Sequence, residues 1–124
     1  MVDEYRLIRS PKHEKKYRII TPAGKSIDFG AKGYSDYTIH KNPMRMRMYI
    51  QRHGGSVPKN IKDEMRKSVV HKKMLGITKS EKEKWTKAGV ETAGFWSRWL
   101  LWSKPDKKNA CKYIEKKFGL RIKK

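Results

Sequence analysis

The stretch Thr92-Ala-Gly-Phe-Trp-Ser-Arg-Trp-Leu-Leu-Trp-Ser-Lys-Pro105 decides how this chain folds. It holds three of the four tryptophans and one of the three phenylalanines of a protein whose formal net charge is +20. Within it, Phe95, Trp99 and Trp102 recur at the i, i+4 and i+7 spacing of one helix face. A strongly charged chain must either bury such an aromatic block or bind a partner with it. We expect this stripe to fill the gap between a small sheet and the helices.

Length and composition indicate one folded domain, residues 1–124, with a cationic exterior. Lys and Arg number 32 against 12 Asp and Glu, but four Trp, six Tyr and three Phe provide large side chains for a core. Cys111 is the only cysteine, which excludes an internal disulfide and favours a reducing compartment. We expect no secretory signal, since the start lacks an apolar segment, and no membrane span. A polyanion or an acidic protein surface is the expected neighbour.

The N-terminal residues 1–30 predict a β-rich unit. Lys16–Ile20 and Lys25–Phe29 alternate apolar and polar side chains, and Thr21-Pro-Ala-Gly24 between them has the composition of a tight turn. Tyr5–Arg9 alternates weakly and predicts a further short strand. These segments together predict a small antiparallel hairpin or sheet.

Residues 35–119 predict a mainly helical body, so the expected class is α+β, with the hairpin packed on the helices. Proline at helix starts, glycine at helix ends and capping residues mark the boundaries. The expected helices are 37–41 capped by Ser35 or Asp36, 44–53 after Pro43, 59–75 ending at Gly76, 82–85 after a capping box at 78–81, the Trp-rich segment, and one from Pro105 to Gly119. Leu120–Lys124 predicts a closing strand.

The sequence contains no arrangement typical of catalysis. The four histidines, His13, His40, His53 and His71, form no pair at helical spacing, and no metal motif surrounds them. Gly30-Ala-Lys-Gly33 lacks the Gly-Lys-Ser/Thr of a phosphate loop and is read as a bend. Lysines near Cys111 favour a reactive thiol, but burial is more frequent for a free cysteine and is expected here. We therefore predict a non-enzymatic protein without cofactor, metal or small-molecule substrate.

Candidate partner-binding residues are tryptophan and basic side chains that lie off the expected core stripe. Trp96 and Arg98 could stack on bases or dock against a partner, and burial in the core is the alternative for Trp96. The basic residues either solvate helices or contact phosphates and carboxylates. The full set is Trp96, Arg98, Arg45, Arg47, Arg52, Lys59, Lys62, Arg66, Lys67, Lys72 and Lys73. No RNA-binding motif accompanies them, and a helix-turn-helix over 59–88 has no distinctive turn, so nonspecific polyanion contact is favoured over sequence reading.

Three segments carry a resemblance to a known family. They are residues 16–41 (KYRIITPAGKSIDFGAKGYSDYTIHK), residues 49–54 (YIQRHG) and the Trp-rich block 92–105. Together they resemble small basic proteins of large double-stranded DNA viruses such as the algal phycodnaviruses and the marseilleviruses. The match spans most of the chain and is less clear over 56–90. The resemblance implies no catalytic residues and a virion-associated protein, a minor component of the capsid shell.

Two functional hypotheses follow. In the first, which the resemblance favours, the protein is a minor capsid component of the virion, made in the host cytoplasm. It would cement major capsid proteins through their acidic surfaces or tie the shell to an anionic inner membrane. In the second, which composition favours, it is a nonspecific nucleic-acid-binding protein that packages or organises viral DNA. We expect the first.

The aromatic stripe gives a testable prediction for stability. Trp99→Ala should lower the free energy of unfolding by about 3–5 kcal/mol, the usual cost of truncating a core aromatic side chain. Denaturant unfolding of the variant and the parent measures this difference. If both unfold at the same denaturant concentration, the stripe is an interface and not a core.

Overall fold

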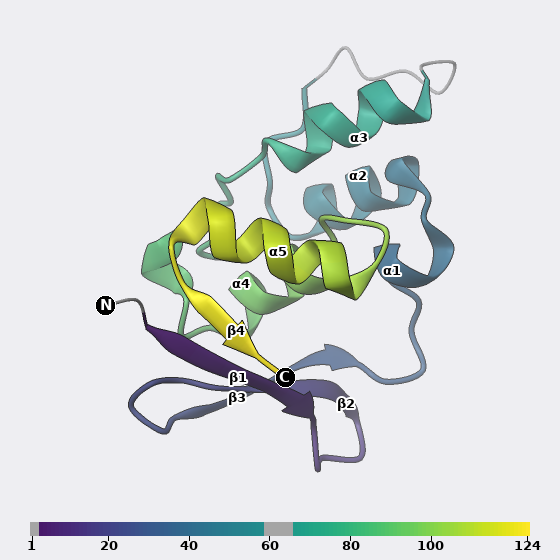
Figure 1. Ribbon diagram of the computed structural model, residues 1–124. Coiled ribbons are helices and arrows are strands. Elements are labelled where there is room, and N and C mark those ends of the chain that lie inside the picture. Colours follow the sequence, from purple (N-terminus) through teal and green to yellow (C-terminus); the bar gives the residue numbers. More distant parts are fainter. Residues whose placement is uncertain (1–2, 59–65) are drawn as a thin grey trace.

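Four strands form a single mixed sheet in the order β3-β2-β1-β4 (Figure 1). The computed structural model describes residues 3–58 and 66–124. Strands β1 (Glu4–Arg9), β2 (Lys15–Ile20) and β3 (Ser26–Ala31) run antiparallel, and β4 (Arg121–Lys123) pairs parallel to β1. The N-terminal hairpin and the closing strand predicted from the sequence are thereby confirmed.

The turn between β2 and β3 forms where its sequence predicts. The Thr21 backbone N–H donates to the Lys25 carbonyl at 2.8 Å, and the Thr21 hydroxyl accepts from the Lys25 N–H at 3.1 Å. Gly24 has a φ of +88°, a conformation that a residue without Cβ adopts at little cost. The resulting register places Tyr17 opposite Phe29 and Ile19 opposite Ile27, so the apolar side chains of both strands share one face.

The remaining elements are helical, which confirms the α+β class. They are α1 (Tyr37–His40), α2 (Pro43–Arg52), α3 (Lys67–Leu75), the 3-10 turn η1 (Lys87–Gly89), α4 (Ala93–Trp96), the π-helical turn η2 (Ser97–Leu101) and α5 (Lys107–Phe118). Polar side chains at the predicted starts accept hydrogen bonds from the first turns: Asp36 for α1, Asn42 for α2, Thr92 for α4 and Asp106 for α5. Gly119 ends α5 in the left-handed conformation, with φ +66°. None of these described helices is long and apolar enough to cross a membrane.

The helices are arranged in two layers relative to the sheet. Figure 1 shows α4 and α5 over one face of the sheet, with α2 and α3 packed against each other farther from it. One continuous hydrophobic core contains side chains from the sheet and from both helical layers. The Trp-rich segment α4–η2 therefore lies at the centre of the molecule.

Two helix predictions differ from the structure. The predicted helix over 82–85 is wrong: the Ser80 hydroxyl accepts from the Lys82 and Glu83 N–H groups as a cap would, but the chain continues as a series of bends. Burial of Trp85, whose indole N–H donates to Glu83 at 2.9 Å, pulls this segment into the core instead. For the helix predicted over 59–75, the described part begins at Lys67, and 59–65 lie outside the described residues.

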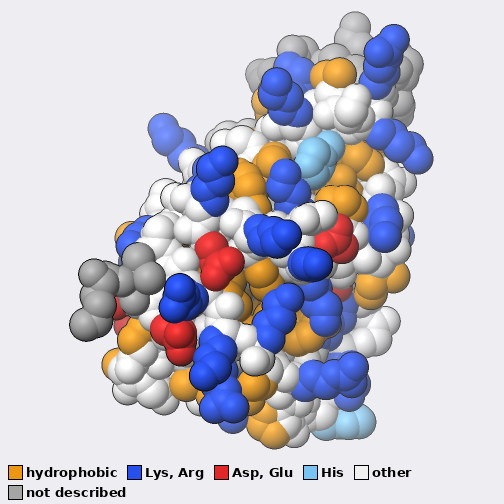
Figure 2. Space-filling model, in the orientation of Figure 1, with side chains coloured by type: hydrophobic (Ala, Val, Ile, Leu, Met, Phe, Trp, Pro, Cys, Tyr) orange, Lys and Arg blue, Asp and Glu red, His pale blue; other side chains and the backbone are white. Residues whose placement is uncertain are grey.

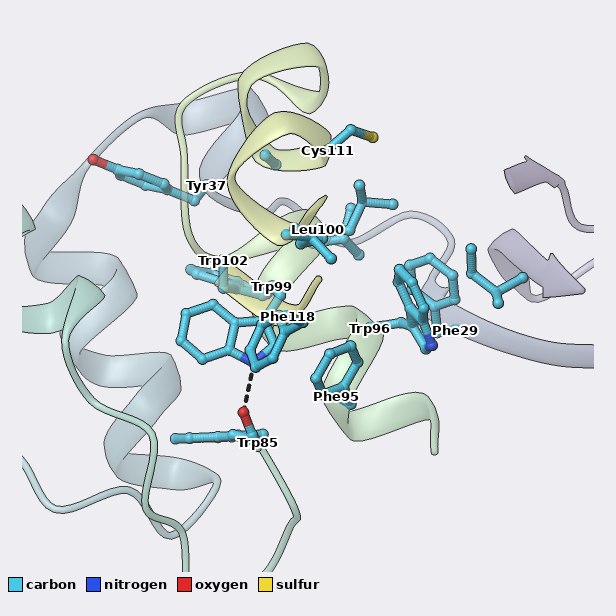
Figure 3. Packing of buried hydrophobic residues seen from close by; sticks show 14 of the residues in the cluster. Phe29, Tyr37, Trp85, Phe95, Trp96, Trp99, Leu100, Trp102, Cys111 and Phe118 are labelled. Atoms are coloured by element: carbon cyan, nitrogen blue, oxygen red, sulfur yellow. Dashed lines mark hydrogen bonds between the residues drawn. The ribbon is translucent and has the colours of Figure 1, made fainter. Parts of the chain in front are cut away.

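All four tryptophans belong to the core (Figure 3). Phe95 and Trp99 are fully buried and Trp102 is 8% exposed, which confirms the predicted stripe. The Trp99 indole N–H donates to the Trp85 carbonyl at 2.8 Å, the dashed line in Figure 3, so its one polar atom is satisfied. Cys111 is buried as expected, and burial raises the pKa of its thiol.

The outer face of the sheet carries a bidentate ion pair between neighbouring strands. Arg18 on β2 donates to both carboxylate oxygens of Asp28 on β3, at 2.9 and 3.0 Å, and Ser10 donates to the same carboxylate at 2.6 Å. These bonds hold the pKa of Asp28 down at about 2, with Arg18 the larger cause and Ser10 the next. The pair thus adds to sheet stability only while Asp28 is ionised.

The depressed pKa gives a pH-dependent prediction. Since the pKa of Asp28 is lower in the folded protein than its ordinary value, its stabilising contribution should be complete above about pH 4 and disappear as the pH falls to about 2. The difference in unfolding free energy between the parent and Asp28→Asn should therefore shrink over this range in denaturant titrations. Glu14→Gln, which changes an exposed carboxylate of the same unit, is the control. A difference that stays constant with pH would contradict the assignment.

Candidate functional site

A cavity of about 460 Å³ opens between the end of the sheet and the helices. Its wall comes from the end of β3, the loop that leads to α1, one side of α2, and the start of the Trp-rich segment. The polar and aromatic side chains that line it are Lys15, Lys16, Phe29, Tyr34, Ser35, Asp36, Arg45, Tyr49, Arg52, His53, Glu83, Ser97 and Trp102. Its volume lies within the range of about 300–1,000 Å³ typical of ligand pockets.

Both carboxylates of the cavity are already compensated. Asp36 is buried, accepts from Lys16 Nζ at 2.6 Å and caps α1 through Thr38 N–H at 2.9 Å. Glu83 lies 3.1 Å from His53 Nδ1 and also accepts the Trp85 indole N–H. Burial by itself raises the pKa of Glu83, but these hydrogen bonds outweigh it and lower the pKa below its ordinary value. Both carboxylates thus already have hydrogen-bond partners within the protein.

Three cations of the cavity remain free for a ligand. Lys15, Arg45 and Arg52 form no ion pair within the described residues. Arg45 and Arg52 are exposed, and Lys15 is half-buried. With the two carboxylates compensated, these three side chains give the cavity a net positive charge, so an anion is the ligand it favours.

The rim of the cavity carries an aromatic ring on an anchored backbone. The Tyr34 side chain is 74% exposed, although its backbone carbonyl accepts from Lys16 Nζ at 2.5 Å and its N–H donates to the Ala31 carbonyl at 3.3 Å. Gly33, with φ +90°, makes the turn that brings Tyr34 to this position. The ring is thus presented to solvent by a fixed loop and is available to a planar partner.

Two buried groups near the cavity have no hydrogen-bond partner within the described residues. Tyr49 lines the cavity, is 4% exposed, and stacks on Trp102 with ring centroids 4.4 Å apart. Its hydroxyl has no partner, and burial raises its pKa far above the ordinary value. His40 also packs against Trp102, with ring centroids 5.2 Å apart, and its Nε2 is unpartnered as well. Burial lowers the pKa of His40, and the charge of Arg45 lowers it further, so this imidazole is neutral at pH 7.

The structure brings only two of the predicted binding residues into this cavity, Arg45 and Arg52. Arg47 of the same helix is half-buried, and its Nε has no partner in the described part of the chain. Arg66, Lys67, Lys72 and Lys73 are exposed at and along α3 and do not line the cavity. Lys59 and Lys62 lie outside the described residues.

Trp96 corrects one prediction, because its side chain is fully buried and cannot contact a partner. It packs against Tyr5 and Phe29 of the sheet, with ring centroids 5.6 and 6.4 Å away, and donates to the Val90 carbonyl at 2.8 Å. The neighbouring Phe95 packs against Phe118 of α5. Because α4 lies between the sheet and α5, the neighbouring residues Phe95 and Trp96 are both buried, on opposite sides of the helix. A prediction based on one apolar stripe places only one side of the helix in the core.

Arg98 corrects a second prediction, because its guanidinium is also fully buried. It donates to the carbonyls of Trp102, Met74 (2.6 Å) and Ile77 (3.2 Å) and lies over the Trp99 ring, 4.4 Å from its centroid. No carboxylate of the described residues pairs with it. Burial lowers its pKa to about 10, so it is still charged at pH 7. Arg98 therefore has a structural role.

Two site residues, Lys15 and Tyr34, were missed by sequence reasoning. Lys15 precedes a predicted strand and resembles every other surface lysine. Tyr34 follows the Gly30–Gly33 bend, and an aromatic residue directly after a turn glycine was the available signal. Among the described residues, no three His, Cys, Asp or Glu side chains are grouped so that they could hold a metal ion.

Comparison with known proteins adds one finding. Residues 5–53 are similar to a family described as a family of unknown function (DUF5754). The matched segment covers less than half of the chain and runs from β1 to the end of α2, including Lys15, Tyr34, Arg45 and Arg52. No curated protein and no solved structure matches the chain.

The buried guanidinium gives a stability prediction. Arg98→Met should lower the free energy of unfolding by about 3–5 kcal/mol, because several buried carbonyls lose their donor together. Arg98→Lys keeps the charge but not the planar fork of donors, and should also be destabilising. Denaturant unfolding at pH 7 measures both variants. A methionine variant at least as stable as the parent would mean that the cost of burying the charge exceeds the gain from its bonds.

Proposed function

We propose that this protein is a non-enzymatic binding protein that contacts the phosphate backbone of nucleic acids without reading their sequence, and so packages or organises DNA. One observation carries the proposal: positive charge on the described surface is largely uncompensated. Of the lysines and arginines there, only Lys12, Lys16, Arg18 and Lys25 pair with a carboxylate. The viral setting of this role rests on the sequence resemblance alone.

The distribution of these cations favours backbone contact over a single docking pose. Figure 2 shows Lys and Arg side chains over the whole visible face, from the sheet to the region of α3, with few Asp and Glu between them. Each phosphate that such side chains neutralise releases condensed counterions, which favours binding to any sequence. Trp96 and Arg98, the predicted contacts to bases or to a protein partner, are buried, so the exposed lysines and arginines are left for binding.

A role as a minor capsid protein on the acidic surface of coat proteins is the second candidate. It is favoured by exposed apolar side chains beside the basic ones: Ile39 on α1 is 62% exposed and Met48 on α2 is 53% exposed. A protein partner that covers them would gain hydrophobic burial, which a phosphate backbone does not offer. This candidate predicts one defined pose.

Salt dependence separates the two roles. With duplex DNA, the logarithm of the binding constant should fall linearly with the logarithm of salt concentration, with a slope of about −0.9 for each neutralised phosphate. A variant with Arg66, Lys67, Lys72 and Lys73 changed to Gln should show a shallower slope, since these exposed residues are expected to contact phosphates. Fluorescence anisotropy between 50 and 200 mM salt measures both slopes, over the range in which such contacts weaken binding by orders of magnitude.

The same titration with isolated capsomers tests the alternative. DNA binding that persists at physiological salt, without capsomer affinity, supports the nucleic-acid role. Salt-resistant capsomer binding together with DNA binding that physiological salt abolishes would reject that role in favour of the capsid one.

A further inference from the structure

We infer that the cavity beside α2 is a binding site for single-stranded nucleic acid, in which an unpaired base stacks on Tyr34 while Lys15, Arg45 and Arg52 hold the neighbouring phosphates. This inference rests on the proposed nucleic-acid role. It adds that this one site prefers single-stranded to duplex nucleic acid. The remaining surface cations would bind duplex and single strand alike.

The first support is the exposed ring of Tyr34. An aromatic side chain that is 74% exposed gains little for the fold. Its backbone, however, is held by hydrogen bonds to Lys16 and Ala31, so the loop that carries the ring need not lose backbone entropy on binding. Single-strand-binding proteins combine such aromatic platforms with cations that follow the backbone.

The second support is the charge beside that ring. Lys15, Arg45 and Arg52 line the same cavity as Tyr34 and lack carboxylate partners in the described chain, whereas Lys16 and His53 are occupied by Asp36 and Glu83. A free cation beside a free aromatic ring matches the alternation of phosphate and base along an unpaired strand. In a duplex the bases are stacked inside the helix and cannot reach the ring.

The third support is the shape of the site. The cavity, of about 460 Å³, has room for a nucleobase, and its aliphatic wall includes Met48 and Leu101. Gly30 allows β3 to lie close to Leu101. A Cβ at this position would be 2.9 Å from Leu101 Cδ1, and the φ of +80° disfavours residues other than glycine. The site is concave and has an apolar wall, a cationic rim and one projecting aromatic ring. This shape suits an unpaired base with its attached phosphates better than it suits duplex DNA.

The inference is tested by changing Tyr34 and the base separately. Affinities of the parent, Tyr34→Ala and Tyr34→Phe are measured for a thymidine oligonucleotide, for an abasic oligonucleotide of the same length and charge, and for a duplex. Tyr34→Ala should weaken thymidine binding by roughly five- to 100-fold, the usual effect of losing one stacked base. Duplex and abasic binding should change less than about twofold, and Tyr34→Phe should bind like the parent.

A charge-matched pair of variants tests the phosphate contacts. Arg45→Gln with Arg52→Gln should weaken single-strand binding more than Lys108→Gln with Lys112→Gln, which removes two exposed charges from α5 outside the cavity. Equal losses for the two pairs, or a Tyr34→Ala loss that is the same for thymidine and abasic strands, would overturn the cavity as the site and leave the proposed function intact. A parent protein that binds none of the three nucleic acids at physiological salt would overturn both.

Discussion

The buried guanidinium of Arg98 is the interaction on which the rest of the structure depends. It joins three parts of the helical body, because its donors reach Met74 and Ile77 at the end of α3 and Trp102 after η2, while Met46 of α2 lies against it. A charge without a counter-ion costs much free energy in a dry core. Here carbonyl dipoles and the faces of Trp99 and Trp85 take the place of water. The tryptophans are thus required as much to enclose this cation as to fill volume.

The π-helical turn η2 makes that enclosure possible. A wider turn rotates successive side chains differently from an α-helix, and all four residues from Arg98 to Leu101 are buried as a result. Directly after the turn, the Ser103 hydroxyl donates to the Trp99 carbonyl. The central segment therefore contacts the sheet on one side and α5 on the other, and its Phe95, Trp96 and Trp99 side chains are fully buried.

These features explain which parts of the structure the sequence predicted. The hairpin and the ends of α1, α2 and α5 were correct because they depend on local chemistry: a Pro-Ala-Gly turn, the cap Asp36, Pro43 at the start of α2, and Gly119. The core stripe was correct because its spacing is helical. Trp96 and Arg98 were assigned to a surface because a regular helix has an outer face, whereas this short segment is covered on both sides. The cavity could not be predicted, since it forms where β3, α2 and α4 meet and these are far apart in sequence.

The division between a sealed aromatic core and a free cationic surface has a thermodynamic consequence for binding. At a net charge of +20 the surface cations repel one another, and this repulsion opposes the folded state. A polyanion that neutralises them relieves the repulsion and binds the folded form preferentially, so binding and folding stabilise each other. The core contributes to this by keeping the surface residues in place. The Arg98 guanidinium is fully buried and does not contact the anion. In the proposed role, the cavity adds what uniform charge cannot provide, an exposed aromatic ring among the cations, and so a basis for distinguishing one form of nucleic acid from another.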